Sequence, residues 1–543
     1  MSLRILRCGL EGGLVLMTDR PDAPSTALAC AERQAELAPL APPLASPPPS
    51  LPPLLRALFF GAQPVAPCDA CIQTHISWVL LAGDYAYKFK KPLKLAFLDF
   101  STLALRKHYC EEELRLNQRY APELYLDLLP VYGTPEHPKW SGTAEPIEYA
   151  VRMRRFDDQA RLDRVCERGE LTPAHLTGLA RSVVAFHQSA QAAGPGSVLG
   201  SVATIRQQAF DNLDALRGAA TDAATQARLL ILRQWTEQQC SLLAPLMEQR
   251  QQQGWVRECH GDLHLGNMVL RDQQVRLFDC LEFSQELRWI DVASDLAFTW
   301  VDLLAHQRPG LASWFLNEAL LWSGDYASAP LLRFYAVYRA LVRAKVAALQ
   351  SRPDSAAVDY LALAQRLVTP QRLSLRITHG LSGCGKTFAS NALLQADASA
   401  NTLRLRTDAE RKRRFQHGLL DKTGSALEAG MYAADESART YAKLLELARD
   451  LLRSHWSVLV DGTFLQRAQR DAFGQLAADE GVDFSILAPQ APLALLRERV
   501  SRRQQSGADP SEATLTVLAH QLEVLEPLAA DEPVWPTVAR PKC

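Results

Sequence analysis

Short apolar runs and helical periodicities divide the chain into distinct regions. In the N-terminal half, Ile76–Leu81 and Tyr85–Lys90 flank a Gly-Asp turn and predict a β-hairpin, and Glu148–Phe156 predicts another strand. Beyond Thr172-Pro173, a helix start with threonine as cap and proline at the first position, apolar residues recur at helical spacing. This pattern predicts a small β-rich lobe followed by a larger helical lobe, up to about residue 365.

The pattern changes after residue 372. A strand at Leu373–Thr378 runs into glycine, and helices and strands then alternate, which predicts a parallel sheet with helices on both faces. The further predicted strands are 403–406, 457–460 and 484–487, and the predicted helices begin after Lys386 and cover 437–452 and 492–503.

The predicted domain plan follows from these regions. The stretch Pro39–Pro53 is too rich in proline for regular structure, so 1–54 is predicted to be a disordered tail. An α+β bilobal domain is predicted for 55–365, a linker for 366–372, an α/β domain for 373–535 and a tail for 536–543.

Composition and charge argue against some classes of protein function. The chain has 543 residues, 48% hydrophobic and 22% charged, with 59 basic against 60 acidic residues. Near-neutral charge argues against a dedicated nucleic-acid or membrane-surface binder, and no apolar run approaches the roughly 20 residues of a spanning helix.

Met1–Leu16 lacks the apolar core of a signal peptide, and Met17 is an alternative start. The scattered cysteines, including Cys68-x-x-Cys71 followed by His75, are interpreted as reduced thiols of a cytoplasmic protein, because one of four metal ligands is missing.

A phosphate-binding loop is the clearest motif. Its residues are Gly380, Leu381, Ser382, Gly383, Cys384, Gly385, Lys386 and Thr387, and they match G-x-x-x-x-G-K-[ST] between a predicted strand and a predicted helix. The glycines let backbone N–H groups face phosphate oxygens, Lys386 reaches the β- and γ-phosphates, and the Thr387 hydroxyl binds Mg²⁺. This segment therefore predicts an ATP site.

Carboxylates and arginines around this loop predict phosphoryl transfer. Asp461 ends an apolar strand, as the magnesium-holding aspartate of such sites does. Asp408 is placed to accept a proton from a substrate hydroxyl, and a role as N-cap of a helix 409–415 is compatible. Arg499 and Arg503 share a helix face and are expected to neutralise charge on the transferred phosphoryl, with a solvated basic face as the alternative.

Residues 373–530 resemble the P-loop kinases grouped with zeta toxins and polynucleotide 5′-kinases. The likeness is carried by Gly380–Thr387, Arg406-Thr407-Asp408 with Arg411-Lys412, Val460–Phe464, Arg499 to Arg503 and Asp509–Ala513. It implies Asp408 as the substrate base, Asp461 as the magnesium aspartate and the arginine helix as a lid. Members of this group phosphorylate different hydroxyls, so the resemblance indicates the reaction better than the substrate.

A second constellation lies in the N-terminal half. In His260–Asn267, Asp262 and Asn267 have the spacing of a kinase catalytic loop, in which the carboxylate orients the acceptor hydroxyl and the amide binds Mg²⁺. Asp279, after the strand Val275–Phe278, is the expected second magnesium ligand.

Upstream residues complete a kinase-like site. Lys88 is expected to bind the α- and β-phosphates, with Lys90 and Lys91 as alternatives, because Lys88 and Lys90 lie on the same strand face. Glu113 is the expected partner of that lysine. Met153–Asp157 is the expected hinge for adenine. Asp291 and Asp295 are expected to cap and brace the catalytic loop, in a structural or a functional role.

Residues 55–365 resemble the aminoglycoside phosphotransferase-like branch of the protein-kinase fold, and most closely the proteins that fuse this domain to a P-loop ATPase. The segments that carry the likeness are Tyr87–Pro92, Leu98–Ser101, Glu113-Leu114 and His260–Asn267. No G-x-G-x-x-G precedes Lys88, and residues that would hold a polycationic antibiotic are not identifiable, so antibiotic resistance does not follow.

The combined prediction is a cytoplasmic bifunctional phosphotransferase. It would use ATP and Mg²⁺ at two sites, one on an α+β protein-kinase-like domain and one on an α/β P-loop domain, and act on small-molecule hydroxyls. The alternatives are an ATP-binding regulatory protein with one catalytically silent domain, and a nucleic-acid 5′-hydroxyl kinase, which the neutral charge disfavours.

Overall fold

The computed structural model describes residues 51–60, 68–95, 98–194, 196–349, 355–421, 434–506 and 513–535. All of them belong to one compact unit, residues 43–543. Residues 1–50 of the predicted tail lie outside the described residues, as do both candidate start methionines, the motif residues Asp509–Glu512 and the C-terminal tail.

The small lobe is an antiparallel sheet in the order β1-β2-β3-β8-β6-β7. Its strands are β1 (Cys68–Gln73), β2 (Ser77–Ala82), β3 (Tyr85–Lys90), β6 (Tyr125–Gly133), β7 (Pro138–Lys139) and β8 (Glu148–Arg154), and the short pair β4 (Lys94–Leu95) and β5 (Leu98–Asp99) stands apart. The predicted hairpin is β2–β3, with Gly83 at a φ of 53° in its turn. The helix α2 (Leu103–Asn117), capped by Thr102, packs on β6 and β8. The helix α1 (Pro53–Phe60) begins inside the predicted tail, because Leu51 and Leu55 are buried against the sheet.

The large lobe is mainly helical. Its helices are α3 (Leu162–Glu167), α4 (Pro173–Ser189), α5 (Val202–Ala219), α6 (Ala223–Gln252), α7 (Gln285–Arg288), α8 (Val292–Ala305), α9 (Pro309–Ser323), α10 (Ala329–Leu349) and α11 (Ser355–Val368). Short antiparallel pairs join β10 (Met268–Arg271) to β11 (Gln274–Leu277) and β12 (Trp289–Asp291) to β9 (Val256–Glu258). Since β9 ends at Glu258 and β10 begins at Met268, the segment His260–Asn267 forms the loop between them.

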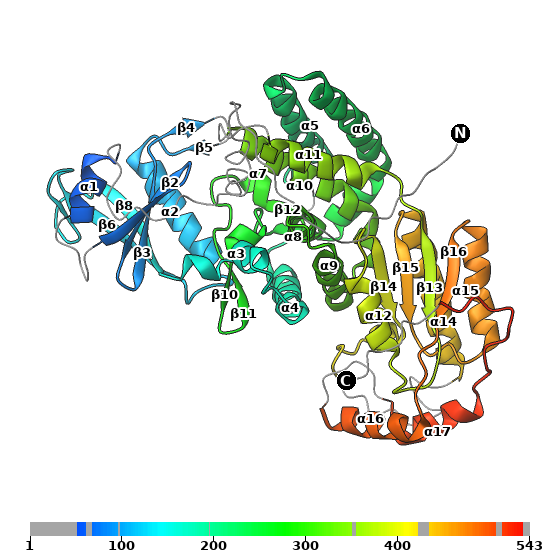
Figure 1. Cartoon of the computed structure of the whole chain (residues 1–543). Helices are drawn as coiled ribbons and strands as arrows, with labels where there is room; N and C mark the ends of the chain where they lie inside the picture. Colours follow the sequence, from blue (N-terminus) through cyan, green and yellow to red (C-terminus); the bar gives the residue numbers. More distant parts are fainter. Residues whose placement is uncertain are drawn as a thin grey trace, which may run out of the picture. The chain divides into compact units, whose positions relative to one another are not determined.

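The C-terminal domain is a four-stranded parallel sheet in the order β14-β15-β13-β16. Its strands are β13 (Ser374–Thr378), β14 (Thr402–Arg406), β15 (Ser457–Asp461) and β16 (Asp483–Leu487), and its helices are α12 (Lys386–Gln395), α13 (Thr407–Arg414), α14 (Ala434–Arg453), α15 (Arg467–Asp479), α16 (Leu493–Ser506) and α17 (Leu515–Glu523). The helices α16 and α17 lie together at one end of this sheet (Figure 1). The predicted fold class, a bilobal kinase-like domain followed by a P-loop domain with a parallel sheet, is confirmed.

Side chains of the helical lobe complete the edge of the parallel sheet. The Asn317 amide on α9 donates to the Thr402 carbonyl at 2.9 Å and accepts from the Arg404 N–H at 2.6 Å. The outward backbone groups of the edge strand β14 are therefore paired as a neighbouring strand would pair them. The Trp456 indole donates to the Ala329 carbonyl at 3.0 Å, and its ring lies 5.4 Å from that of Trp300. The two domains consequently share one hydrophobic core.

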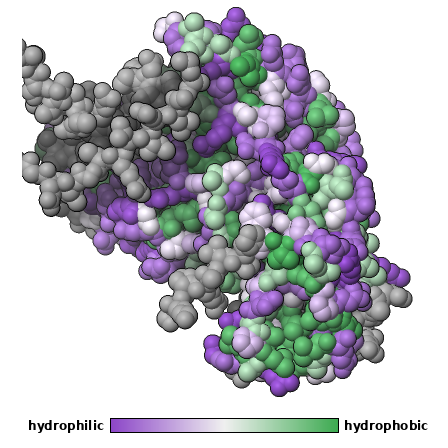
Figure 2. All heavy atoms as spheres, turned by 45° about the vertical axis from the view of Figure 1, so that its right-hand side comes forward, coloured by the Kyte–Doolittle hydropathy of each residue, from purple (hydrophilic) through white to green (hydrophobic). Residues whose placement is uncertain are grey.

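Hydrophilic residues spread over the face in Figure 2, interrupted by smaller hydrophobic areas. Among the described residues, no helix is long and apolar enough to cross a membrane.

Candidate active sites

Lys88 lies between two acidic residues that come from different lobes. Its Nζ is 2.7 Å from Glu113 Oε1 on α2 and 2.5 Å from Asp279 Oδ1, which follows β11. Burial acts to lower the pKa of Lys88, but the two carboxylates outweigh it and hold the pKa well above its ordinary value. A permanently charged lysine beside a proposed magnesium ligand is suited to nucleotide phosphates. Lys91 lies elsewhere and donates to the Thr74 carbonyl.

Lys90 extends the same ionic cluster away from Asp279. Its Nζ is 2.5 Å from Glu113 Oε2 and also contacts Glu282, and both Lys90 and Glu282 are buried. Although burial raises the pKa of Glu113, the two lysines lower it to about 2. No sequence motif contains Glu282. The sequence feature that could have pointed to it is that Glu282 is a carboxylate three residues after the expected magnesium ligand Asp279.

The catalytic-loop residues Asp262 and Asn267 lie together. The Asn267 amide donates to Asp262 Oδ2 at 2.9 Å and to the Asp262 carbonyl at 3.0 Å, and His264 Nε2 is 3.4 Å from Asp262 Oδ2. Burial acts to raise the pKa of Asp262, but the charge and hydrogen bond of His264, helped by Arg343, hold it well below the ordinary value. The carboxylate is thus ionised at neutral pH and can accept a hydrogen bond from an acceptor hydroxyl.

Asp295, on the helical lobe, holds the backbone of this loop. Asp295 accepts the backbone N–H of His260 at 2.9 Å and of Gly261 at 3.0 Å. Asp291, also expected to cap and brace the loop, instead caps α8 by accepting the Ala293 N–H, and it binds Arg250 at 2.7 Å. Gly261 has a φ of 82°, and a Cβ there would meet the Leu287 carbonyl at 2.9 Å, so glycine is required at this turn.

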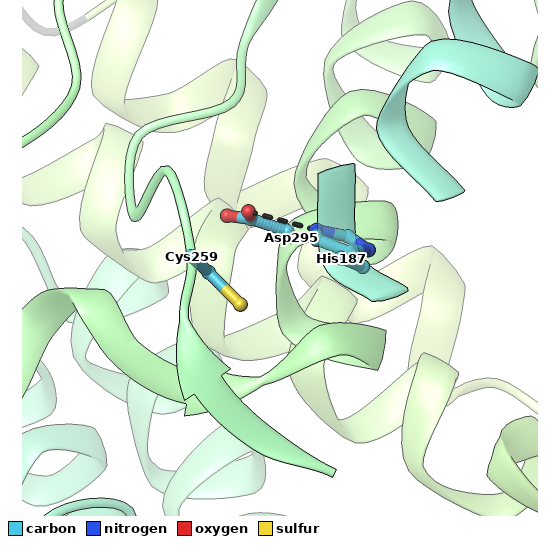
Figure 3. A group of neighbouring side chains, drawn as sticks. All are labelled: His187, Cys259 and Asp295. Atoms are coloured by element: carbon cyan, nitrogen blue, oxygen red, sulfur yellow. Dashed lines mark hydrogen bonds and ion pairs between the residues drawn. The ribbon is translucent and has the colours of Figure 1, made fainter. Parts of the chain in front are cut away.

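Figure 3 shows Asp295 beside His187 and Cys259, which are close enough together to hold a metal ion. His187 Nε2 is 3.2 Å from Asp295 Oδ2, and the Cys259 thiol donates to the Ile290 carbonyl at 3.5 Å. Burial raises the pKa of Cys259 well above its ordinary value, which disfavours the thiolate that a metal needs. Since both Asp295 oxygens already accept loop N–H groups, we interpret the cluster as a brace. Among the described side chains, Cys68, Cys71 and His75 form no such cluster.

The phosphate-binding loop has the backbone that its motif predicts. Gly380, Gly383 and Gly385 have positive φ values of 130°, 85° and 106°. A Cβ at Gly383 would approach the Leu496 carbonyl to 3.0 Å, so the loop passes closely against α16. Lys386 Nζ donates to the carbonyls of Gly380 at 2.9 Å and Leu381 at 2.8 Å. The lysine is therefore held over the loop that would receive phosphates.

Asp461 is fixed at the end of β15. The Ser390 hydroxyl donates to Asp461 Oδ2 at 3.2 Å, and Arg406 Nε is 3.8 Å from the same oxygen. The Thr378 hydroxyl, on the neighbouring strand β13, lies 3.5 Å from Asp461 Oδ1. Asp461 and Thr387 line one cavity with the loop, so the predicted pair of magnesium ligands faces the same space.

Asp408 also lines this cavity, and Arg411 Nη1 lies 3.1 Å from its Oδ1. The interpretation of Asp408 as an N-cap is wrong. The helix α13 begins at Thr407, so Arg406 is the capping residue and Asp408 lies in the first turn, where a carboxylate favours the positive end of the helix dipole.

The cavity has a volume of about 870 Å³ and is closed on one side by α16 and α17. Both Arg499 and Arg503 line it, and Arg499 donates to the Gly383 carbonyl at 3.1 Å. The Gln521 side-chain oxygen accepts the Ser382 N–H at 2.8 Å. A protein side chain thus accepts the hydrogen bond of a loop N–H group of the kind that binds phosphate oxygens. Gln521 belongs to no motif, and no pattern in the sequence points to it.

The donor atoms at both sites suit Mg²⁺, which prefers oxygen ligands. In the kinase-like site, Asn267 uses its amide nitrogen on Asp262, which leaves the amide oxygen for a cation, and the Asp279 side chain is 39% exposed. In the P-loop site, the oxygens come from Asp461 and Thr387. No sulfur or imidazole ligand is required at either site.

Comparisons with known proteins found a family model, solved structures and curated relatives similar to parts of this chain. The model of an AAA domain matches residues 375–528. Among solved structures, a choline/ethanolamine kinase family protein from Mesorhizobium loti is 12% identical, with a TM-score of 0.35 over 59% of this chain and 92% of that chain. A gluconokinase from Sinorhizobium meliloti 1021 is 22% identical, with a TM-score of 0.21 over 30% of this chain and 82% of that chain. The AAA domain model covers the segment in which the structure has the phosphate-binding loop and the parallel sheet.

Two mycobacterial relatives match almost the whole chain. The uncharacterized protein Rv2004c of Mycobacterium tuberculosis (strain ATCC 25618 / H37Rv) and the uncharacterized protein Mb2027c of Mycobacterium bovis are each 30% identical over 470 residues. The aligned region covers 86% of this chain and 90% of each relative. The chain therefore belongs to the family of these mycobacterial proteins.

Proposed function

We propose that the chain is a bifunctional ATP-dependent phosphotransferase with one ATP–Mg²⁺ site in each domain, acting on small-molecule hydroxyls. The observation that carries the proposal is the pairing of Lys88 with Glu113 and Asp279 beside a loop that joins Asp262 to Asn267. Burial of these charges is costly unless each is paired, and here the pairing brings side chains of both lobes together where a nucleotide would bind.

At the kinase-like site, Lys88 would bind phosphate oxygens while Asp262 accepts the hydrogen bond of the acceptor hydroxyl. Attack of that hydroxyl oxygen on the γ-phosphorus breaks the bond to the ADP oxygen, and the hydroxyl proton passes to Asp262. Asn267 and Asp279 would hold Mg²⁺, which neutralises phosphate charge when bound.

At the P-loop site, Lys386 and the loop amides would bind the β- and γ-phosphates. Asp408, beside Arg411 at 3.1 Å, would accept the proton of a second acceptor, and Arg499 and Arg503 would neutralise the transferred group. Thr387 and Asp461 would hold Mg²⁺. The cavity is within the size range of small-molecule sites, which supports a compact acceptor.

The test is ATP turnover by variants of the full chain, because the domains share a core. Lys386→Ala and Asp262→Ala should each remove one part of the turnover with a metabolite mixture as acceptor, and the double variant should remove both. Asp272→Asn, in the exposed turn between β10 and β11, is the matched control and should leave turnover unchanged.

The same variants discriminate the alternatives. Full turnover in Asp262→Ala and none in Lys386→Ala would identify the kinase-like domain as a silent binding module. Turnover that requires single-stranded DNA or RNA, and that falls steeply with salt, would support a nucleic-acid end kinase instead.

A further inference from the structure

Lys90 is an ionic residue that the proposed reaction does not use. Its side chain is 1% exposed and lies between Glu113 and Glu282, whose side chains are 0% and 4% exposed. Lys88 occupies the neighbouring position on the same strand face and is the lysine that contacts Asp279. The nucleotide-facing role therefore falls to Lys88, and Lys90 lies behind it.

Glu282 ends a short segment that begins with the proposed magnesium ligand Asp279. Small-lobe groups fasten this segment at successive positions. The Asp279 N–H donates to the Tyr125 hydroxyl on β6 at 3.0 Å, and the Cys280 N–H donates to Asn117 Oδ1 on α2 at 2.9 Å. The Lys90–Glu282 contact adds β3 as a third point of attachment.

The segment needs such attachment because of its backbone. Asp279 has a φ of 63°, in the left-handed region that non-glycine residues adopt only when the surrounding structure holds them there. A change at Glu282 would therefore be transmitted to the orientation of the Asp279 carboxylate. Groups that orient a ligand without touching the metal commonly change its affinity.

We propose that Lys90 and Glu282 form a positioning pair, which fixes the segment 279–282 against the small lobe and so sets the magnesium-dependent part of nucleotide binding. The inference rests on the proposed function of the kinase-like site. Lys90 and Glu282 have no part in the proposed reaction itself, and the pair would act only through the position of Asp279.

The test uses the full chain carrying Lys386→Ala, which silences the P-loop site. Binding of a non-hydrolysable ATP analogue is measured by calorimetry with and without Mg²⁺. The readout is the affinity with Mg²⁺ divided by the affinity without it, called the magnesium ratio. Glu282→Gln should lower this ratio by roughly 10-fold. Glu148→Gln is the matched control, because it breaks a similarly buried pair with Arg106 at 2.9 Å. The other hydrogen bonds of that pair run to the backbone of Phe100, Ser101 and Tyr149, and not to the segment 279–282.

A double variant separates positioning from stability. Removing one partner leaves a buried unpaired charge, whereas removing both partners is commonly tolerated. Lys90→Met with Glu282→Gln should therefore recover thermal stability while its magnesium ratio stays low. Lys90→Arg, which keeps the charge, should have a higher magnesium ratio than Lys90→Met.

The outcomes are distinct. A magnesium ratio in Glu282→Gln equal to that of Glu148→Gln, or a ratio restored in the double variant, would overturn the positioning role alone. Absence of any nucleotide binding in the Lys386→Ala parent would overturn the proposed function of the kinase-like site, and the inference with it.

Discussion

Replacing Glu113 by glutamine removes the carboxylate that two buried lysines share. The side chain is fully buried, and its oxygens lie 2.7 Å from Lys88 and 2.5 Å from Lys90. Glutamine keeps the shape of the side chain but not its charge, so Lys88 would keep Asp279 as partner and Lys90 would keep Glu282. The variant therefore tests the charge and not the packing.

The expected loss of folding stability follows from the pKa of Glu113. The pKa falls from 4.5 to about 2 in the folded chain, because the attraction of Lys88 and Lys90 outweighs burial, which acts to raise it. That difference corresponds to about 3 kcal/mol of stability at neutral pH, of the same order as the cost of breaking a buried ion pair. We expect Glu113→Gln to lose this amount.

The pH dependence has a defined sign. Because the folded pKa lies below the unfolded one, the stabilisation by Glu113 is fully present above pH 4.5 and is lost as the pH falls towards about 2. The difference in stability between the natural chain and Glu113→Gln should therefore be constant near neutrality and should narrow below pH 4.5.

The assay is urea denaturation at a series of pH values, with hydrogen exchange of α2 as a local measure of opening. Glu111→Gln is the control, because Glu111 lies on the same helix but is 52% exposed and pairs with Lys107 at 3.7 Å, a contact worth at most about 0.5 kcal/mol. A loss in Glu113→Gln no larger than in Glu111→Gln, or a loss independent of pH, would refute the reasoning.

Two further predictions concern the P-loop domain. Asn317→Ala should destabilise the chain by about 2–4 kcal/mol in urea denaturation, because it leaves the Thr402 carbonyl and the Arg404 N–H without their partner, and a loss near zero would show that the edge strand does not depend on the helical lobe. Gln521→Ala should tighten ATP binding roughly fivefold in calorimetry, because ATP then no longer competes with one hydrogen bond to Ser382; weaker binding would mean that Gln521 contacts the nucleotide.

Local patterns were sufficient to predict the elements that carry the sites. The β2–β3 hairpin, the strand that ends at Asp461 and the helix after Lys386 follow from apolar periodicity and turn residues, and the structure has them within a few residues. Such features depend on neighbours in the chain. Strand alternation also placed Lys88 and Lys90 on one face, which the structure confirms through their shared partner Glu113.

Contacts between distant segments could not be predicted from the sequence. Glu282 meets Lys90 across 192 positions of the chain, and Asn317 meets the backbone of β14 across 85 and 87 positions. Neither residue belongs to a motif, and a polar residue in an apolar helix gives no indication of its partner. The capping interpretation of Asp408 was wrong for a related reason, since helix ends shift by a residue or two with their tertiary surroundings.

The most direct measurement of the central claim is the number of nucleotides bound per chain. Equilibrium dialysis with a non-hydrolysable ATP analogue and Mg²⁺ should give two per chain for the natural protein, one for Lys386→Ala, one for Lys88→Met and none for the double variant. A single nucleotide per chain that Lys386→Ala abolishes and Lys88→Met leaves intact would contradict the account of two ATP sites.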